Sequence, residues 1–193
     1  MITVLKNIDT SLLLFLNDRH TPLADTFMLW ISGIWIWIPL YVGLVIYIKH
    51  HQPQNWGFVL LFACILVSLT DQISVHLFKE VFLRYRPSHN LVLRSRLHLV
   101  NDYAGGLYGF ISSHAANTFG IAAYIGLVCR TYQPQLRKWL FAWASLVSLS
   151  RIYLGVHYPS DVVVGAIVGI LLGFMIFYLT SSKTTISQFP DKH

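Results

Sequence analysis

Long apolar stretches separated by short polar segments make up most of the 193-residue chain. Five stretches approach or reach the roughly 20 residues that an α-helix needs to cross the hydrocarbon core of a bilayer. They cover residues 26–48, 56–78, 113–129, 136–154 and 161–180. The first carries no charge over its 23 positions, which would extend about 34 Å as a helix. The pattern predicts an all-α fold, a polytopic transmembrane helical bundle with five spans.

The first 17 residues follow a different pattern, with an apolar face and two charged residues, Lys6 and Asp9, off that face. The apolar positions are Ile2, Leu5, Leu12, Phe15 and Leu16. This pattern indicates an interfacial helix that lies on the membrane surface. A sixth span is the alternative. Thr21-Pro22 then separates this helix from the first span.

The composition narrows the class of protein. Hydrophobic residues make up 55% of the chain and charged residues 11%, compared with about 25% charged residues in soluble domains. A chain this short has too little interior to hide so much apolar side chain from water. These proportions argue against a soluble enzyme, a disordered protein and a nucleic-acid partner. The length predicts one domain covering residues 1–193.

Polar residues gather at three places, each where a predicted span begins or ends. In chain order the groups are Lys79 with Arg86; Ser112, Ser113 and His114; and Ser150, Arg151, His157 and Asp161. In a five-span bundle these helix ends all lie on the same side of the membrane. The topology, argued from hydropathy alone, therefore predicts that the three groups meet at one depth.

The residue types in these groups suit a phosphate. Lys79, Arg86 and Arg151 are cations, and a guanidinium matches phosphate oxygens with its planar fork. Ser112 is placed to cap the third span. The free backbone amides of the next residues, Ser113 first, would then point toward an anion with the help of the helix dipole. We expect these five residues to bind the substrate phosphate.

Two histidines can divide the roles of nucleophile and acid near neutral pH, namely His114 and His157. Asp161 lies one helical turn after His157, close enough to orient its ring through one nitrogen. The other nitrogen stays free to attack phosphorus. Because phosphoryl transfer depends mainly on positioning and on neutralised oxygens, these residues suffice without a metal or another cofactor.

The three groups resemble the signature of the type 2 phosphatidic acid phosphatase (PAP2) superfamily, in motifs at residues 79–87, 111–114 and 150–161. The first motif, Lys, six residues and Arg-Pro, matches fully. The third, Ser-Arg, five residues, His, three residues and Asp, also matches fully. The second, Pro-Ser-Gly-His, appears as Ile111-Ser112-Ser113-His114. The exchange of Gly for Ser changes how closely the backbone can be approached.

The resemblance implies a role for each matching residue. It implies that His157 forms a phosphohistidine, that Asp161 orients it, and that His114 protonates the leaving oxygen. It implies a phosphate cradle formed by Lys79, Arg86, Ser112, Ser113 and Arg151. Family members need no metal. The resemblance implies no particular oligomeric state.

The small loops favour a lipid phosphate or pyrophosphate whose tail stays in the bilayer. Undecaprenyl pyrophosphate is the first expectation, because small bacterial members of the family often act on it. Lipid A is the second, and phosphatidic acid or phosphatidylglycerol phosphate the third. A non-enzymatic transporter would account for Asp71 inside a predicted span but not for the motif spacing. Asp71 either supports the site or pairs within the bundle.

The distribution of positive charge bears on orientation. Eight of the 14 Lys and Arg residues lie on the motif side, and five remain when Lys79, Arg86 and Arg151 are set aside as phosphate ligands. The other side carries six: Lys49, Arg130, Arg137, Lys138, Lys183 and Lys192. This bias weakly favours the other side as cytoplasmic. We therefore expect a multi-pass inner-membrane protein whose site faces the extracytoplasmic side, in line with the resemblance.

Overall fold

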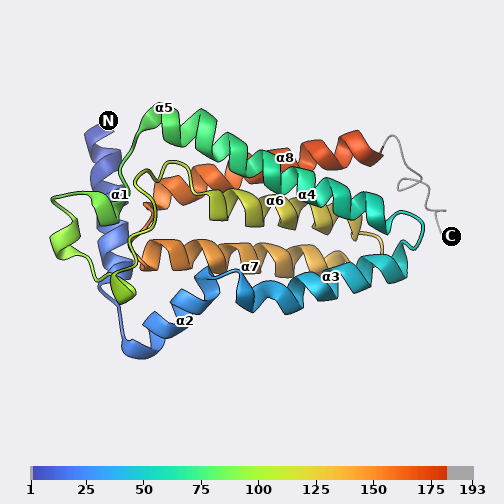
Figure 1. The fold of residues 1–193 in the computed structure, drawn as a ribbon, viewed down its shortest axis with the longest axis horizontal. Coiled ribbons are helices and arrows are strands. Elements are labelled where there is room, and N and C mark those ends of the chain that lie inside the picture. The colour runs from blue at the N-terminus through green and yellow to red at the C-terminus, as the bar shows by residue number, and fades with distance from the viewer. Residues whose placement is uncertain (1, 182–193) are drawn as a thin grey trace.

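The computed structural model describes residues 2–181, and helices form the fold. Four helices run side by side along the long axis of the bundle (Figure 1). These are α4 (Trp56–Gln72), α6 (Ser113–Val128), α7 (Pro134–Tyr153) and α8 (Pro159–Ser181). Within the described residues no strand occurs beyond an isolated bridge between Tyr85 and Tyr108. The predicted all-α class is confirmed.

The helices α6 and α8 make the most extensive contact in the bundle, because glycines allow their backbones to approach closely. Gly165, Gly169 and Gly173 are all buried on one face of α8. A Cβ atom at Gly169 would lie 2.1 Å from the carbonyl oxygen of Ala116 on α6. This contact sets the start of α8, which carries Asp161, against the start of α6.

The first predicted span is not one straight helix, and this prediction is corrected. Helix α2 (Pro22–Ser32) ends at Gly33, and a short 3₁₀ turn, η1 (Trp35–Trp37), leads into α3 (Ile38–His51). The two helical parts are bent by 69°. Gly33 is extended (φ −77°, ψ 152°), which interrupts the helical backbone, and Pro39 has no amide to continue a helical ladder. Hydropathy reports neither effect.

The second predicted span is longer and less regular than a plain α-helix. Its α4 part continues through a π-helical stretch, η2 (Ile73–Lys79), into α5 (Glu80–Phe82). Stretches of π-helix are rare and frequently occur at functional sites. Lys79 is the last residue of this stretch.

The number of spans stays a prediction. Within residues 2–181, two helices are long and apolar enough to cross a membrane, Trp56–Phe82 and Pro159–Ser181. A third results if α2 and the segment Trp35–His51 count as one bent span. Helix α6 has 16 residues, fewer than the roughly 20 of a typical span. The tail charges Lys183 and Lys192 lie outside the described residues.

The N-terminal helix α1 (Ile2–Asn17) lies across one end of the bundle, beside the loop that joins α5 to α6 (Figure 1). Its apolar residues Leu5, Leu12 and Phe15 are about half exposed or more, as an interfacial helix requires. Its inner face instead carries Leu13 and two polar residues, Asp9 and Asn17, all buried. The helical pattern of the sequence does not predict the burial of Asp9.

Candidate active site

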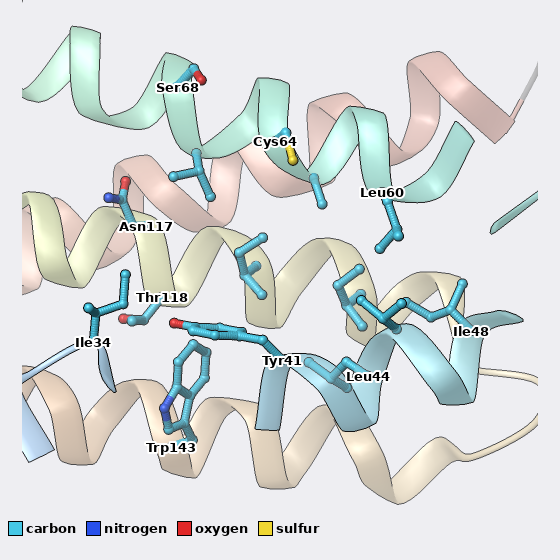
Figure 2. A pocket seen from close by; sticks show the side chains of 15 residues that line it. Ile34, Tyr41, Leu44, Ile48, Leu60, Cys64, Ser68, Asn117, Thr118 and Trp143 are labelled. Carbon is cyan, nitrogen blue, oxygen red and sulfur yellow. The ribbon is translucent and has the colours of Figure 1, made fainter. Parts of the chain in front are cut away.

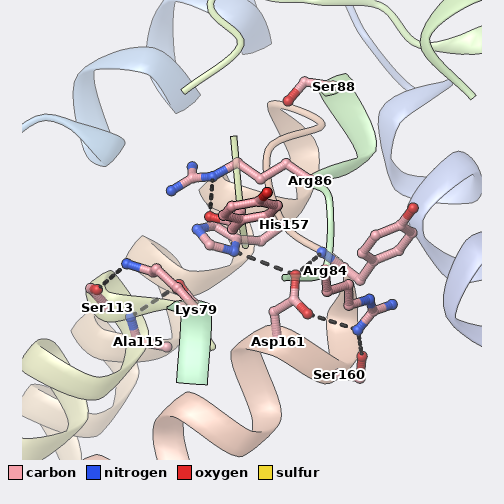
Figure 3. A network of polar contacts seen from close by, with 12 residues as sticks. Lys79, Arg84, Arg86, Ser88, Ser113, Ala115, His157, Ser160 and Asp161 are labelled. Atoms are coloured by element: carbon pink, nitrogen blue, oxygen red, sulfur yellow. Dashed lines mark hydrogen bonds and ion pairs between the residues drawn. The ribbon is translucent and has the colours of Figure 1, made fainter. Parts of the chain in front are cut away.

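His157 and Asp161 meet where α7 gives way to α8. His157 lies in the connection between the two helices and is 1% exposed, and Asp161 in the first turn of α8 is 0% exposed. The His157 Nδ1 atom lies 3.5 Å from Asp161 Oδ2 (Figure 3). This distance is longer than a hydrogen bond and is of the kind that shortens when substrate binds. The predicted spacing of one helical turn thus brings the two groups together.

The carboxylate of Asp161 is held from both sides. Its Oδ2 accepts a hydrogen bond of 3.0 Å from the Tyr158 amide, and its Oδ1 accepts one of 2.7 Å from Arg84 Nη1. Arg84 also donates from Nη2 to Asp9 Oδ2 at 2.6 Å. Ser160 joins this network through its amide and hydroxyl, which both donate to Asp9.

Sequence reasoning missed the Arg84–Asp9 link. The helical pattern of the sequence places Asp9 off the apolar face of an interfacial helix, and none of the three motifs includes Arg84. The two are 75 positions apart, so no spacing rule joins them. The available signal was the polar positions 9 and 17 flanking Leu13 on one face of α1, because residues four apart share a helix face.

Lys79 and Ser113 are in direct contact, although they are 34 positions apart. The Lys79 amine donates a hydrogen bond of 2.6 Å to Ser113 Oγ (Figure 3). Ser113 stands where the family motif has Gly, so this departure provides an anchor for the lysine. Ser112 caps α6 as predicted, because its Oγ accepts from the Ala115 amide at 3.4 Å. Its own amide donates to the backbone oxygen of Asp161 at 3.0 Å.

Arg86 is buried against the loop between α5 and α6. It is 9% exposed, and its Nε donates to the Tyr108 carbonyl at 3.2 Å. Gly109 leaves room for it, since a Cβ atom there would lie 2.9 Å from Arg86 Cγ and 3.2 Å from Asp161 Oδ2. Burial, together with the charge of Arg151, lowers the pKa of Arg86 to about 10, which leaves the guanidinium protonated at neutral pH.

Arg151, in the last turn of α7, is 2% exposed. Its Nη1 contacts Ser32 Oγ on α2, and its Nη2 donates to the Tyr103 hydroxyl at 3.1 Å. Its Nε has no hydrogen-bond partner within residues 2–181. A buried cation with an unused donor has remaining capacity to bind an anion.

The electrostatics of His157 show that the groups share one site. Burial lowers the pKa of His157 well below its ordinary value, and the charges of Arg86, Arg151 and Lys79 lower it further. His114, at the start of α6, lies close enough to interact electrostatically with His157 and with all three cations. The structure therefore brings together the eight residues for which the sequence predicts a catalytic or phosphate-binding role. A neutral imidazole beside three cations can attack a phosphate whose charge those cations neutralise.

Apolar helices surround a site that holds three cations and two histidines. This combination defines the class of protein as a membrane-embedded phosphatase. The sequence model of the PAP2 superfamily matches residues 56–185, and the chain belongs to this superfamily. The resemblance in the three motifs is thereby confirmed.

Two relatives are similar over most of their length. The chain is 36% identical to a lipid A 4'-phosphatase of Bacteroides thetaiotaomicron, over 97% of this chain and 84% of that protein. It is 32% identical to a lipid A 4'-phosphatase of Porphyromonas gingivalis, over 88% of this chain and 72% of that protein. Together with the superfamily match, they identify the chain as a membrane lipid phosphatase that hydrolyses phosphoric monoesters.

Two solved structures share the fold. The crystal structure of Aquifex aeolicus LpxE superposes with a TM-score of 0.64 and 23% identity, covering 88% of this chain and 94% of that one. A phosphatidylglycerolphosphate phosphatase from Bacillus subtilis gives a TM-score of 0.71 and 20% identity, covering 94% and 88%. At these identities the likeness concerns the fold.

Proposed function

We propose that the protein is a lipid A phosphatase that releases a phosphate monoester from the sugar headgroup through a phosphohistidine on His157. The observation that carries the choice of substrate is the 36% identity, over 97% of the chain, to a lipid A 4'-phosphatase. Lipid A, the second expectation from the sequence, therefore replaces undecaprenyl pyrophosphate as the first choice of substrate. Undecaprenyl pyrophosphate is the competing substrate in the test below.

The proposed first step forms one bond and breaks another. His157 Nδ1 faces Asp161, which leaves Nε2 to attack phosphorus. The bond between phosphorus and the ester oxygen breaks, and His114 donates a proton to the leaving oxygen. Lys79, Arg86 and Arg151 neutralise the phosphoryl oxygens as charge develops on them.

The second step returns the enzyme to its starting state. His114, now neutral, accepts a proton from a water molecule, whose oxygen attacks phosphorus. The bond between phosphorus and His157 breaks, and inorganic phosphate leaves. The Arg84–Asp161 contact at 2.7 Å holds the carboxylate that orients the imidazole in both steps.

A cavity within the bundle supports a substrate with hydrocarbon chains. It has a volume of about 600 Å³ and lies among α3, α4, α6 and α7, lined mostly by apolar side chains (Figure 2). Asn117 and Thr118 lie toward one end, and Leu60 and Ile48 toward the other. Thr118 Oγ1 donates to the His114 carbonyl at 2.8 Å, so this end lies one helical turn from the proposed acid. We infer that an acyl chain occupies the cavity while the headgroup phosphate reaches His157.

The test is a phosphate-release panel with purified, reconstituted protein. The substrates are bis-phosphorylated lipid A, undecaprenyl pyrophosphate and phosphatidylglycerol phosphate, and the His157→Ala variant is the control. We expect the fastest release from lipid A, at one phosphate per lipid by mass spectrometry, and none from the variant. Faster release from undecaprenyl pyrophosphate would make that lipid the substrate. Full activity of His157→Ala would remove the nucleophile assignment.

We also propose that the site faces the extracytoplasmic side of the inner membrane. The charge distribution along the loops supports this orientation weakly. Single cysteines test it in a background with Cys64→Ala and Cys129→Ala, at exposed Ser95 in the loop between α5 and α6 and at exposed Gln135 in the first turn of α7. An impermeant thiol reagent added to intact spheroplasts should label position 95 and spare position 135. The reverse pattern would invert the topology.

A further inference from the structure

Three potential metal ligands meet at the end of the bundle that carries α1, outside the catalytic residues. His20 lies in the turn between α1 and α2, Asp25 in the first turn of α2, and His98 in the loop between α5 and α6. One ligand atom from each lies within 4.8 Å of the other two. His20 is exposed, and the other two are half-buried. None of the three belongs to a PAP2 motif.

The geometry points to a divalent transition-metal site, with Zn²⁺ as the best-suited ion. His98 Nε2 lies 2.8 Å from Asp25 Oδ2, so a nitrogen and an oxygen ligand are already adjacent. The rings of His20 and His98 stack with centroids 3.8 Å apart and planes 13° from parallel. Because lone pairs on parallel rings do not converge, metal binding requires the exposed His20 to rotate about its side-chain torsions.

The ligands are held by a surrounding shell of hydrogen bonds. Asp25 Oδ1 accepts from the Tyr153 hydroxyl at 2.7 Å, which leaves Oδ2 directed toward His98. The His98 amide donates to Asn17 Oδ1 at 2.8 Å, and Asn17 Nδ2 donates to the His98 carbonyl at 2.9 Å. Outer contacts of this kind orient the ligands of metal sites and raise their affinity. They also distinguish the cluster from side chains that meet by chance on a surface.

The donor set selects the metal. Imidazole suits zinc and other late first-row ions, whereas Mg²⁺ and Ca²⁺ prefer all-oxygen ligands. Two histidines and one carboxylate occupy three of the four positions of a tetrahedral zinc ion. Asp25 and His98 line a cavity of about 390 Å³, which has room for a water molecule as the fourth ligand.

A metal at this position would join segments that are far apart in the sequence. His20 follows α1, Asp25 belongs to α2, and Tyr153 ends α7 two residues after Arg151. The loop of His98 also carries Tyr103, the hydrogen-bond partner of Arg151. The expected effect is greater thermal stability of this end of the molecule. The phosphate chemistry proposed above does not involve the ion.

The test uses full-length protein, purified without a histidine tag, stripped with chelator and loaded with Zn²⁺ or Co²⁺. We expect one Zn²⁺ per chain after gel filtration, a tetrahedral Co²⁺ absorption band, and a higher Tm with zinc than without. Asp25→Asn and His98→Ala should abolish stoichiometric binding. Tyr153→Phe should weaken binding about ten-fold, because it removes an outer contact.

His50→Gln is the matched control, since this exposed histidine lies in the last turn of α3, away from His20, Asp25 and His98. It should bind zinc like the wild type. If His98→Ala does not fold, His20→Gln carries the test, because the side chain it replaces is exposed. Wild-type protein that contains no zinc after loading and gel filtration would overturn the proposal. The three residues would then be a hydrogen-bonded His–Asp cluster only. Equal binding by wild type and a folded His20→Gln variant would also overturn it.

Discussion

Arg84 is the residue whose replacement tests the proposed site most sharply, because it joins the carboxylate of Asp161 to the N-terminal helix. In Arg84→Gln the charge is lost, and the Asp161 carboxylate, which is 0% exposed, loses a cation at 2.7 Å. Asp9, 8% exposed at its side chain, loses its partner at 2.6 Å in the same substitution. Arg84 also lies 4.0 Å above the Tyr158 ring, a contact that would go as well.

The size of the effect follows from burial. Removing one partner of a fully buried ion pair costs about 3–5 kcal/mol, whereas exposed pairs contribute about 0–1 kcal/mol. Arg84 is 29% exposed while both carboxylates are buried, so water replaces part of the lost interaction. We expect Arg84→Gln to lower the free energy of unfolding by about 2–3 kcal/mol. Asp9→Asn should cost less, because Asp161 keeps its cation.

The effect on catalysis should exceed the effect on binding. Arg84 contacts the orienting carboxylate, so its loss should lower kcat about 100-fold, the scale of a small misplacement of reacting groups. The KM should change little, because Lys79, Arg86 and Arg151 remain. The assay is steady-state phosphate release from lipid A beside a thermal melt, and exposed Arg94→Gln serves as the matched control. A folded Arg84→Gln variant with kcat within three-fold of the wild type would refute the positioning role.

Three further outcomes are expected. Gly169→Ala should destabilise the protein by about 1–3 kcal/mol through overpacking, because its Cβ would lie 2.1 Å from the Ala116 oxygen. Gly57→Ala is the control, because a Cβ atom there would meet nothing within 4 Å, and its Tm should equal that of the wild type. A Gly169→Ala variant with the same Tm as this control would contradict the close packing of α6 and α8. Because the pKa of His157 is lowered, kcat/KM should not lose the nucleophile as pH falls through its ordinary value of about 6.5. Arg86→Gln removes a cation that lowers this pKa, so the acid limb of the kcat/KM profile should move to higher pH. An unchanged acid limb would show that it does not report the protonation of His157. EDTA should leave phosphate release intact, and strong inhibition would contradict a metal-free mechanism.

Much of the candidate site could be predicted from local spacing. His157 and Asp161 are four residues apart across the start of α8, so one helical turn brings them together. Ser112 could be recognised as the cap of α6 because capping depends on a few consecutive residues. The convergence of the three motifs followed from the order of apolar runs, since alternating helix ends fall on the same side.

Other features depended on contacts between distant segments. The salt bridge from Arg84 to Asp9 spans 75 positions, and hydropathy assigned Asp9 to a surface. The bend after Ser32 lies inside the first predicted span, and the π-helical stretch that ends at Lys79 begins inside the second. An average over a window of side chains does not report local backbone geometry.

The sequence by itself determined the membrane class and the helical architecture and singled out the candidate site residues, because these depend on composition and on short-range spacing. Only the tertiary structure decided how the groups are held. It placed α1 across the end of the bundle, joined Asp9 to the carboxylate of Asp161 through Arg84, and brought the Lys79 amine onto Ser113. Such pairings form only when packing excludes water and leaves buried charges to satisfy one another. They are therefore properties of the folded chain and not of any segment within it.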